Sequence, residues 1–369
     1  MGSTDRAESG TSRRDVLGGM AGALGVGVGA GTTAARATAA APTVLTQNLY
    51  LGVDFTRLLG AASYREFRRT VGDILAGIDP ETYRARVDAV AATVETHAPD
   101  VIALQEASLF RTQEPGDFAS PDGARASTVV VDILAAFEAA LRARGLNYRR
   151  AAVTTTSDAE LPATTDDGPV DFRVTDRVAL LVRDGVDATD VVADTYDADI
   201  SVPVPNANRT VALRRGYCRA TVTVGETTFT AVSTHLESVS SFFRVLQARE
   251  LLAALPDDGA VVLGGDFNSG PDHESSAYDL LTESFRDPYA RLRPDTAGHT
   301  CCQAPDLRND RSRLNRRIDA VLCRGGVRAT DVGRVNHREA DRRTVSRGSR
   351  TVSLWPSDHA GVVATFEGA

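Results

Sequence analysis

The sequence predicts an α/β protein in which buried strands alternate with amphipathic helices. Three observations support this class. Runs rich in Val, Ile, Leu and Ala recur along the chain, segments with apolar residues three and four positions apart lie between them, and many of the apolar runs stop at a polar residue. The chain has 369 residues, of which 42% are hydrophobic, which is enough for a sizeable core in one large domain or two smaller ones.

The N-terminal segment is expected to be a targeting signal. Arg13 and Arg14 precede an apolar stretch rich in Gly and Ala, and Ala37-Thr38-Ala39 forms a small-residue cleavage pattern. This arrangement resembles a twin-arginine export signal. We therefore expect residues 1–40 to be a leader, residues 41–369 to be the folded domain, and the protein to be extracellular or at the cell surface. The alternative is a disordered tail that contains an Arg pair by chance.

Polar residues of catalytic type stand at or beside the ends of predicted strands. In chain order they are Asn48, Glu106, His235, Asp266 with Asn268, Asp319, and Asp358 with His359. Each has an ordinary explanation by itself, because a lone His or acid at a strand end is often structural or faces solvent. Their recurrence along the chain predicts that they meet in one site.

The remaining elements follow from periodicity and from breaks in it. Apolar residues at helical spacing predict helices over residues 64–96, 129–144, 242–255 and 275–285. Apolar or β-branched runs predict strands over residues 44–52, 100–106, 174–183, 189–194, 218–224, 229–237, 261–266, 317–322 and 362–366. The polar stretch at residues 154–171 is predicted to be an exposed loop or an extended hairpin.

The segment Val261–Pro271 carries the most informative chemistry. Its apolar run ends in two glycines, which Asp266, Phe267 and Asn268 follow. Alternation along an extended chain would turn Asp266 and Asn268 toward one pocket and Phe267 toward the core. An acid that orients water, beside an amide that stabilises developing negative charge, is a hydrolytic pair. The alternative is a strand that runs into an Asx turn.

The cysteines allow two interpretations. Cys218 and Cys323 lie in predicted strands, whereas Cys301 and Cys302 are adjacent in a loop. An even number of cysteines in an exported protein permits two disulfides, although the sequence does not determine their connectivity. A zinc site is not expected, because no CxxC or paired-His spacing accompanies the cysteines.

The charge balance limits how the protein can bind nucleic acid. All 41 basic residues are Arg, and the net charge is −8. An acidic chain of this kind does not coat DNA with its whole surface, but local basic patches remain available. The most basic part is residues 324–350, which is expected to be a solvated loop; the alternative is a rim that attracts phosphate.

Six short motifs together resemble the endonuclease/exonuclease/phosphatase superfamily. They are Gln47-Asn48-Leu49, Leu104-Gln105-Glu106, Thr234-His235-Leu236, Gly265-Asp266-Phe267-Asn268, Arg317-Ile318-Asp319 and Ser357-Asp358-His359. Each is weak alone, but the set spans most of residues 44–366. The resemblance implies a four-layered α/β sandwich, in which two packed mixed sheets are flanked by helices and the site lies where strand ends meet. Residues 41–369 would then be the catalytic domain.

The resemblance also implies metal ligands. Glu106 would be the principal ligand of a divalent cation, helped by Asn48 and Asp358, with Mg²⁺ as the expected ion and Ca²⁺ or Mn²⁺ as alternatives. The physical reason is that a phosphodiester is an anion that repels a nucleophile. A hard cation held by oxygen ligands neutralises that charge.

The other residues take catalytic and substrate-binding roles in the same comparison. His359, oriented by Asp319, would contact the scissile phosphate or act in acid–base chemistry. His235 would hold the phosphate or the leaving group. Asp266 would position the attacking water, and Asn268 would support the transition state. Arg317, Asn268 and His235 are the predicted substrate-binding residues.

Tyr50 and His235 depart from the DNA-repair branch of the superfamily, which has an acid and an Asn at these places. This favours the branch that resembles secreted nucleases, sphingomyelinases and inositol-phosphate phosphatases. We therefore expect a monomeric phosphodiesterase that acts on nucleic acid or a phospholipid headgroup and has no stable protein partner. A phosphomonoesterase acting on a small phosphorylated substrate and a non-catalytic binding module are the alternatives. Arginines that would favour nucleic acid are Arg308, Arg311, Arg313, Arg316, Arg317 and those of the segment 324–350.

Overall fold

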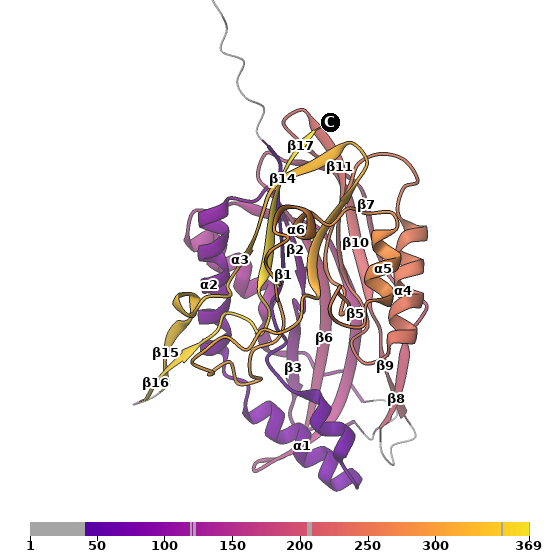
Figure 1. Ribbon diagram of the computed structural model, residues 1–369. Coiled ribbons are helices and arrows are strands. Elements are labelled where there is room, and N and C mark those ends of the chain that lie inside the picture. The colour runs from indigo at the N-terminus through magenta and orange to yellow at the C-terminus, as the bar shows by residue number, and fades with distance from the viewer. Residues whose placement is uncertain (1–40, 119, 121–122, 205–208, 348–349, 369) are drawn as a thin grey trace, which may run out of the picture. The chain divides into compact units, whose positions relative to one another are not determined.

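The computed structural model describes residues 41–118, 120, 123–204, 209–347 and 350–368. The predicted leader, residues 1–40, lies outside the described residues, so the export signal stays a prediction. In the described part, two mixed sheets stand face to face, with helices against their outer faces (Figure 1). The four-layered α/β sandwich implied by the family resemblance is therefore confirmed.

The larger sheet, as far as the described residues show it, has eight strands in the order β14-β17-β1-β2-β6-β3-β4, with β5 along the other side of β6. β1 and β2 are parallel, and the other pairs are antiparallel. The strands are β1 (Thr43–Asn48), β2 (Val101–Gln105), β3 (Leu109–Gln113), β4 (Thr128–Asp132), β5 (Tyr148–Thr165), β6 (Gly168–Arg183), β14 (Val327–Val335) and β17 (Gly361–Gly368).

The smaller sheet has five strands among the described residues, in the order β13-β12-β11-β10-β7. They are β7 (Asp187–Thr195), β10 (Gly216–Val224), β11 (Thr227–His235), β12 (Val261–Asp266) and β13 (Asp319–Arg324). β11 and β12 are parallel, and the other pairs are antiparallel. Two hairpins lie outside the sheets: β8 (Ile200–Val204) with β9 (Arg209–Leu213), and β15 (Arg343–Arg347) with β16 (Arg350–Leu354).

The parallel pairs decide where the polar strand ends lie. Because β1 runs parallel to β2, Asn48 pairs with Gln105, and the next residue, Glu106, leaves the sheet at the same edge. Because β11 runs parallel to β12, His235 pairs with Asp266. Antiparallel β13 then places Asp319 opposite Asp266. The register of three strand pairs thus gathers residues that are far apart in sequence.

Helices connect the strands and cover the sheets. They are α1 (Tyr64–Ala76), α2 (Pro80–His97), α3 (Ile133–Ala143), α4 (Ser241–Ala254), α5 (Ser276–Thr282) and α6 (Pro288–Leu292), with 3₁₀ turns η1 (Phe55–Gly60) and η2 (Glu339–Asp341). α1, α2 and α3 pack on the larger sheet, and α4 and α5 pack on the smaller one. No helix in the described part of the chain combines the length and apolarity needed to cross a membrane.

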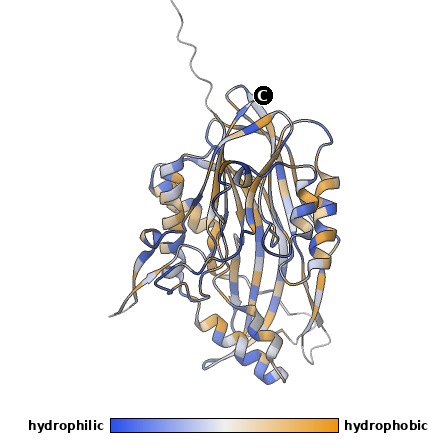
Figure 2. Cartoon of the chain, in the orientation of Figure 1, coloured by the Kyte–Doolittle hydropathy of each residue, from blue (hydrophilic) through white to orange (hydrophobic). Residues whose placement is uncertain are grey.

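The core has three apolar layers, as alternation along the strands requires. In β1, Leu45 points to the helices of the larger sheet, whereas its neighbour Val44 joins the layer between the sheets. Ile102 and Ala103 of β2 divide in the same way. Leu263 of β12 packs against α4 and α5 on the opposite side of the molecule. Figure 2 shows apolar residues along the strands of both sheets, while much of the connecting chain is hydrophilic.

Two predicted helices need correction. Residues 64–96 form two helices, because Gly77 ends α1 and Asp79 caps α2 ahead of Pro80, which lacks an N–H and suits a first turn. The predicted helix at residues 129–144 begins later, at Ile133, because the β-branched residues before it pair as β4.

Two predictions about irregular segments have different outcomes. Residues 154–171 lie in the long hairpin of β5 and β6, one of the two predicted forms. The expectation of a solvated loop at residues 324–350 is wrong for Val327–Val335, because this segment pairs with β17 as β14. Two arginines of residues 324–350 form ion pairs within the protein: Arg328 pairs with Glu367, and Arg342 pairs with Asp310.

Candidate active site

The polar strand ends converge at one edge of the two sheets. The Nδ2 atom of Asn48 lies 3.0 Å from Oε1 of Glu106 and 3.0 Å from Oδ2 of Asp266. Asn48 and Glu106 belong to the larger sheet, and Asp266 belongs to the smaller one. A single amide therefore links acids from both sheets. Asn48 presents its nitrogen to the acids, while its oxygen accepts the Tyr50 N–H at 2.8 Å.

The chain turns sharply at this edge. Tyr50, Glu106 and Asn268 have φ values of 59°, 54° and 49°, in the left-handed region that residues other than glycine seldom adopt. All three follow strand ends closely. The turn at Tyr50 also brings the Leu51 N–H to Oε2 of Glu106, so both oxygens of this half-buried carboxylate are fixed. Such backbone conformations persist where the surrounding contacts enforce them, and they cluster at functional sites.

His359 and Asp319 form a buried pair. Nδ1 of His359 lies 2.8 Å from Oδ2 of Asp319 and 3.8 Å from Oδ2 of Asp266. Burial alone would lower the pKa of His359, but the negative charges of Asp319, Asp358 and Asp266 outweigh it and hold the pKa well above its usual value. His359 is therefore a cation, with Nδ1 occupied and Nε2 directed elsewhere.

His235 has the opposite electrostatic character. Nη1 of Arg215 lies 3.0 Å from Nδ1 of His235, and because a guanidinium only donates, Nδ1 accepts and Nε2 carries the proton. That Nε2 lies 3.4 Å from Oδ2 of Asp266 and 3.1 Å from the side-chain amide of Asn268. Burial, reinforced by the charges of Arg215 and His359, holds the pKa of His235 well below its usual value, so the ring is neutral.

Asp266 stands at the centre of the group. Its Oδ1 accepts the Asn268 N–H at 2.9 Å, so the Asx turn that was the alternative interpretation is present. Asp266 and Asn268 also both contact His235, as a shared pocket requires. Phe267, between them, is buried as predicted, in the apolar layer between the smaller sheet and its helices. Burial and the charge of Asp319 raise the pKa of Asp266 to about 6, against the lowering effect of His359 and of hydrogen bonds from Asn268 and Asn48. At neutral pH, this carboxylate is mostly ionised and close to the pKa that suits a base.

Asp358, like Glu106, is partly buried. Burial raises its pKa to about 7, with Glu106 and Asp266 adding to the increase and His359 and Arg86 opposing it. Burial is the main cause of the rise, and the smaller contributions of Glu106 and Asp266 show that three acids lie near one another. Such a group of acids favours a bound cation.

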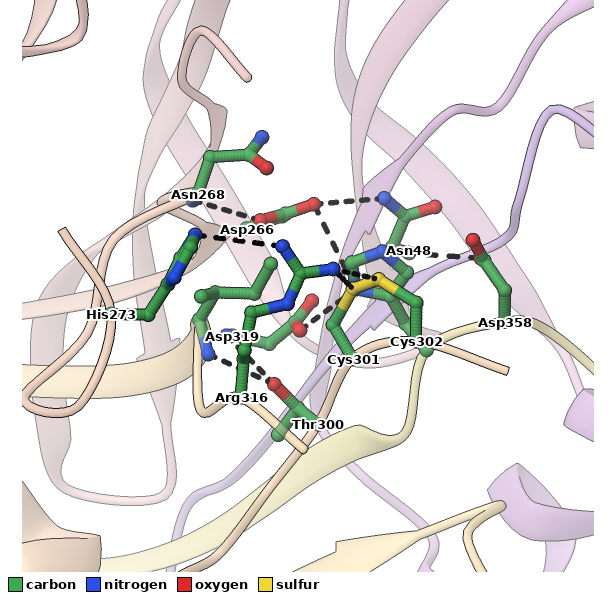
Figure 3. Close-up of a disulfide and its surroundings, with 12 residues drawn as sticks. Asn48, Asp266, Asn268, His273, Thr300, Cys301, Cys302, Arg316, Asp319 and Asp358 are labelled. Atoms are coloured by element: carbon green, nitrogen blue, oxygen red, sulfur yellow. Dashed lines mark hydrogen bonds and ion pairs between the residues drawn. A yellow bond between two sulfur atoms is a disulfide. The ribbon is translucent and has the colours of Figure 1, made fainter. Parts of the chain in front are cut away.

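Arg317 does not reach the site, contrary to the prediction that it binds substrate. Its guanidinium is buried and pairs with Asp287 at 2.6 Å, over the rings of Tyr278 and Tyr289. The guanidinium of the preceding residue, Arg316, lies instead against the disulfide and His273 (Figure 3). Alternation along the chain explains the difference, since neighbouring residues face opposite sides.

Sequence reasoning missed Arg86 of α2. This buried arginine donates to the carbonyl oxygens of Leu49, Tyr50 and Pro356, and it stacks 5.2 Å from the centre of the Tyr50 ring. It thereby ties the end of β1 to the segment that carries Asp358 and His359. Nothing in the sequence distinguishes it from an exposed helical arginine.

Arg215 and Asp176 were also missed. Asp176 is buried on β6, accepts from Ser108 at 2.7 Å, and lies 3.8 Å from Arg215. It helps to hold the arginine that fixes His235. The sequence did carry a signal for Asp176. Asp176 and Arg177 are adjacent within the largely apolar run Val174–Arg183, and buried charges normally occur in pairs.

Cys301 and Cys302 form a disulfide beside the site, whereas Cys218 and Cys323 are free and buried. Of the pairings that the sequence left open, the structure has one bridge, between neighbouring residues. Arg316 Nη2 lies 3.2 Å from Sγ of Cys302 and 3.6 Å from Sγ of Cys301 (Figure 3).

The donor set fits a hard divalent cation. Carboxylate oxygens of Glu106 and Asp266 lie within 4.8 Å of each other, with a nitrogen of His235 within the same distance of both. His235 does not serve as a ligand, because Arg215 donates to its Nδ1 and its Nε2 carries the proton. Glu106 is half-buried rather than sealed, and its carboxylate is fixed by the backbone around Asn48 and Tyr50. Carboxylate oxygens at this spacing are the ligands that Mg²⁺ and Ca²⁺ prefer.

Together, the two-sheet fold and the convergent acids, amides and imidazoles define a hydrolase site at a shared sheet edge. A model of the endonuclease/exonuclease/phosphatase family matches residues 45–359, and the chain belongs to this family. A comparison with curated proteins found no match.

Comparison with solved structures supports the fold. A mannosyl-6-phosphatase of Bacteroides thetaiotaomicron is 17% identical, with a TM-score of 0.51 over 88% of this chain and 99% of that one. An endonuclease/exonuclease/phosphatase of Bacteroides vulgatus is 15% identical, with a TM-score of 0.52 over 89% of this chain and 99% of that one. These similarities concern the architecture alone.

Proposed function

We propose that this protein is an exported, divalent-metal-dependent phosphodiesterase that acts as a monomer on nucleic acid or on a phospholipid headgroup. One observation carries the proposal: Asp266 lies within 4 Å of a protonated imidazole, a neutral imidazole and the Asn48 amide. Hydrolysis of a phosphoryl group needs a base for the attacking water and donors for the phosphoryl oxygens. Asp266 is the base, the two imidazoles are the donors, and the Asn48 amide orients the acids.

Asp266 positions the attacking water and draws off its proton. It suits this task because its two oxygens are held by Asn48 and by the Asn268 backbone. His359 supplies a positive N–H donor for the phosphoryl oxygens, because Asp319 keeps its ring charged and in place. His235 and Asn268 stand on the other side of Asp266 and donate to the phosphate or the leaving group.

Glu106 would hold the divalent cation together with Asp358. Asn48, which the sequence predicted as a ligand, turns its amide nitrogen to Glu106 and its oxygen to the Tyr50 N–H, so it would orient Glu106 rather than bind the ion. When bound, such an ion neutralises the charge of the phosphate and polarises the P–O bond. The protein prepares the ligands by fixing both oxygens of Glu106 against Asn48 and Leu51.

The surroundings of the site favour a large anionic or amphiphilic substrate. Arg308, Arg311 and Arg313 are exposed on the loop between the disulfide and Arg316, where they would meet flanking phosphates. Val239 and Phe242 follow His235 in the chain and are 73% and 66% exposed. Exposed apolar side chains of this kind stack on bases or enter a lipid surface.

The experiment is a substrate panel on the purified full chain. Plasmid DNA, RNA, sphingomyelin, bis-p-nitrophenyl phosphate and sugar phosphates are assayed with Mg²⁺, Ca²⁺ or Mn²⁺ and with EDTA. We expect hydrolysis of at least one diester, loss of activity in EDTA, and recovery when the metal is restored. Diester hydrolysis that persists in EDTA would contradict the metal role, and failure to cleave any ester would favour a binding module.

A phosphomonoesterase is the second candidate, favoured by the structural similarity to the mannosyl-6-phosphatase. The same panel separates the two, because a monoesterase would release phosphate from sugar phosphates and leave bis-p-nitrophenyl phosphate intact. Export is tested separately: we expect secretion to stop when Arg13 and Arg14 are replaced by Lys, as twin-arginine signals require the pair.

A further inference from the structure

The disulfide lies against the catalytic imidazole. The two Sγ atoms of Cys301 and Cys302 and a ring nitrogen of His359 all lie within 4.8 Å of one another. Cys301 is buried and Cys302 is half-buried. Two sulfur atoms and an imidazole nitrogen, which are ligands for soft or borderline metals, therefore lie close together. They lie next to the proposed active site, whose acids offer hard oxygen ligands.

The backbone holds these three residues together independently of the sulfur–sulfur bond. Cys301 pairs with both Arg316 and His359 as isolated β-bridges. The Cys301 N–H donates to the Arg316 carbonyl at 3.0 Å, and the Ala360 N–H donates to the Thr300 carbonyl at 2.8 Å. The Gln303 N–H also donates to the Asp358 carbonyl at 2.9 Å. These bonds would remain after the disulfide is reduced.

We propose that Cys301, Cys302 and His359 form a binding site for a soft divalent cation of the Zn²⁺ class, which is available only when the disulfide is reduced. Two thiolates and one imidazole are a ligand set that Zn²⁺ takes, with a fourth position left for water. Asp319 occupies Nδ1 of His359, as an outer partner does in many zinc sites, so Nε2 is the nitrogen left to coordinate; its nearest acid is Asp358, 3.9 Å away.

The site forms in two balanced steps. A dithiol reductant transfers two electrons and two protons to the sulfur–sulfur bond, which gives two thiols and the oxidised reductant. The cation then displaces both thiol protons and the Nε2 proton of His359, releases these three protons to water, and binds the two thiolates and the neutral imidazole. The sequence argued against zinc because no paired spacing accompanies the cysteines; the fold supplies the third ligand from the segment before β17.

Occupancy would inhibit hydrolysis, and this part rests on the proposed function. A cation on Nε2 of His359 removes the donor that we assign to the phosphoryl oxygens. Arg316 would remain as an outer contact, since its Nη2 already lies 3.2 Å from Sγ of Cys302. Reduction combined with a soft cation would therefore stop the enzyme, whereas either treatment alone would not.

The test is a Cd²⁺ titration of the full chain, oxidised and reduced, followed by the ultraviolet charge-transfer absorption from thiolate to Cd²⁺. We expect one equivalent to bind the reduced protein and no such absorption in the oxidised protein. The double variant Cys301→Ser/Cys302→Ser should lose the absorption. His359→Ala should bind about 10–100-fold more weakly. Cys218→Ala, which removes a buried free thiol elsewhere, should behave as wild type.

An unchanged Cd²⁺ affinity in His359→Ala, or no absorption in the reduced wild type, would overturn the site. Inhibition is measured with Zn²⁺ on any ester that the panel identifies, and we expect it in the reduced wild type and not in the double Ser variant. Equal inhibition of both would refute the blocking role. If no ester is cleaved, the proposed function fails, but the absorption titration still tests the site.

Discussion

Nδ1 of His359 lies 2.8 Å from Oδ2 of Asp319, and both side chains are almost fully buried. The two residues come from different sheets: Asp319 opens β13, and His359 precedes β17. A buried ion pair of this kind keeps a charged imidazole where water cannot supply a counterion. It also directs Nε2 away from Asp319, toward the region where the phosphate is expected.

Replacing Asp319 by Asn should reduce the rate and shift its pH dependence. Without the carboxylate, the pKa of His359 falls, so a smaller fraction of the ring is protonated at neutral pH. We expect kcat/KM to drop by about 10²–10³ and the alkaline limb of its pH profile to move to lower pH. A full pH profile of each protein measures this. A variant that is slower but keeps the wild-type alkaline limb would contradict the role of the charged His359.

Asn48→Ala should weaken metal binding more than it affects folding. The amide of Asn48 donates to both Glu106 and Asp266, so its removal leaves two acids facing each other without a common donor. Loss of such an orienting group typically costs 10–100-fold in metal affinity. Calorimetric titration with Mg²⁺ measures the change, with exposed Asn147→Ala as the matched control. Equal affinity in wild type and Asn48→Ala would exclude this orienting role.

Arg316→Ala should lower activity without lowering stability. Its guanidinium contacts the disulfide and His273 and forms no ion pair with an acid among the described residues, so it is available to an anionic substrate. A charge-assisted hydrogen bond is worth roughly 1.5–3 kcal/mol, which corresponds to about a 10–100-fold loss in kcat/KM. Arg142→Ala, an exposed arginine on α3, is the control. Wild-type kinetics in Arg316→Ala would mean that another residue holds the phosphate.

Arg317→Ala should have the opposite effect. Its partner Asp287 would be left buried without a counter-charge, and breaking such a pair costs about 3–5 kcal/mol of unfolding free energy. Urea denaturation measures the loss. The double variant Arg317→Ala/Asp287→Asn should regain part of it, because no isolated charge remains. If Arg317→Ala is as stable as wild type, the buried pair contributes little to the fold.

The sequence identified polar residues at the ends of strands, but it did not show which strands pair with each other. Asn48, Glu106, His235 and Asp266 follow apolar runs, and that local pattern was enough to identify them. The roles of Arg86 and of the pair Arg317 and Asp287 depend on partners far away in the chain, which no local pattern reveals. The break between α1 and α2 was readable in principle, since Gly77 and Pro80 mark it.

The two adjacent cysteines show the same limit. The sequence near Cys301 and Cys302 contains no further residue at metal-ligand spacing. The third residue of the cluster, His359, lies 57 positions after Cys302 and is brought to it by a β-bridge with Cys301. A site built across segments can be recognised only once the register of the strands is known.

The central claim is that Asp266 positions the water that attacks phosphorus. The most direct measurement is kcat/KM for bis-p-nitrophenyl phosphate in Asp266→Asn, beside the exposed control Asp257→Asn, with circular dichroism to verify folding. We predict a loss of about 10²–10⁴ for Asp266→Asn and wild-type activity for the control. A folded Asp266→Asn protein with undiminished turnover would contradict the claim.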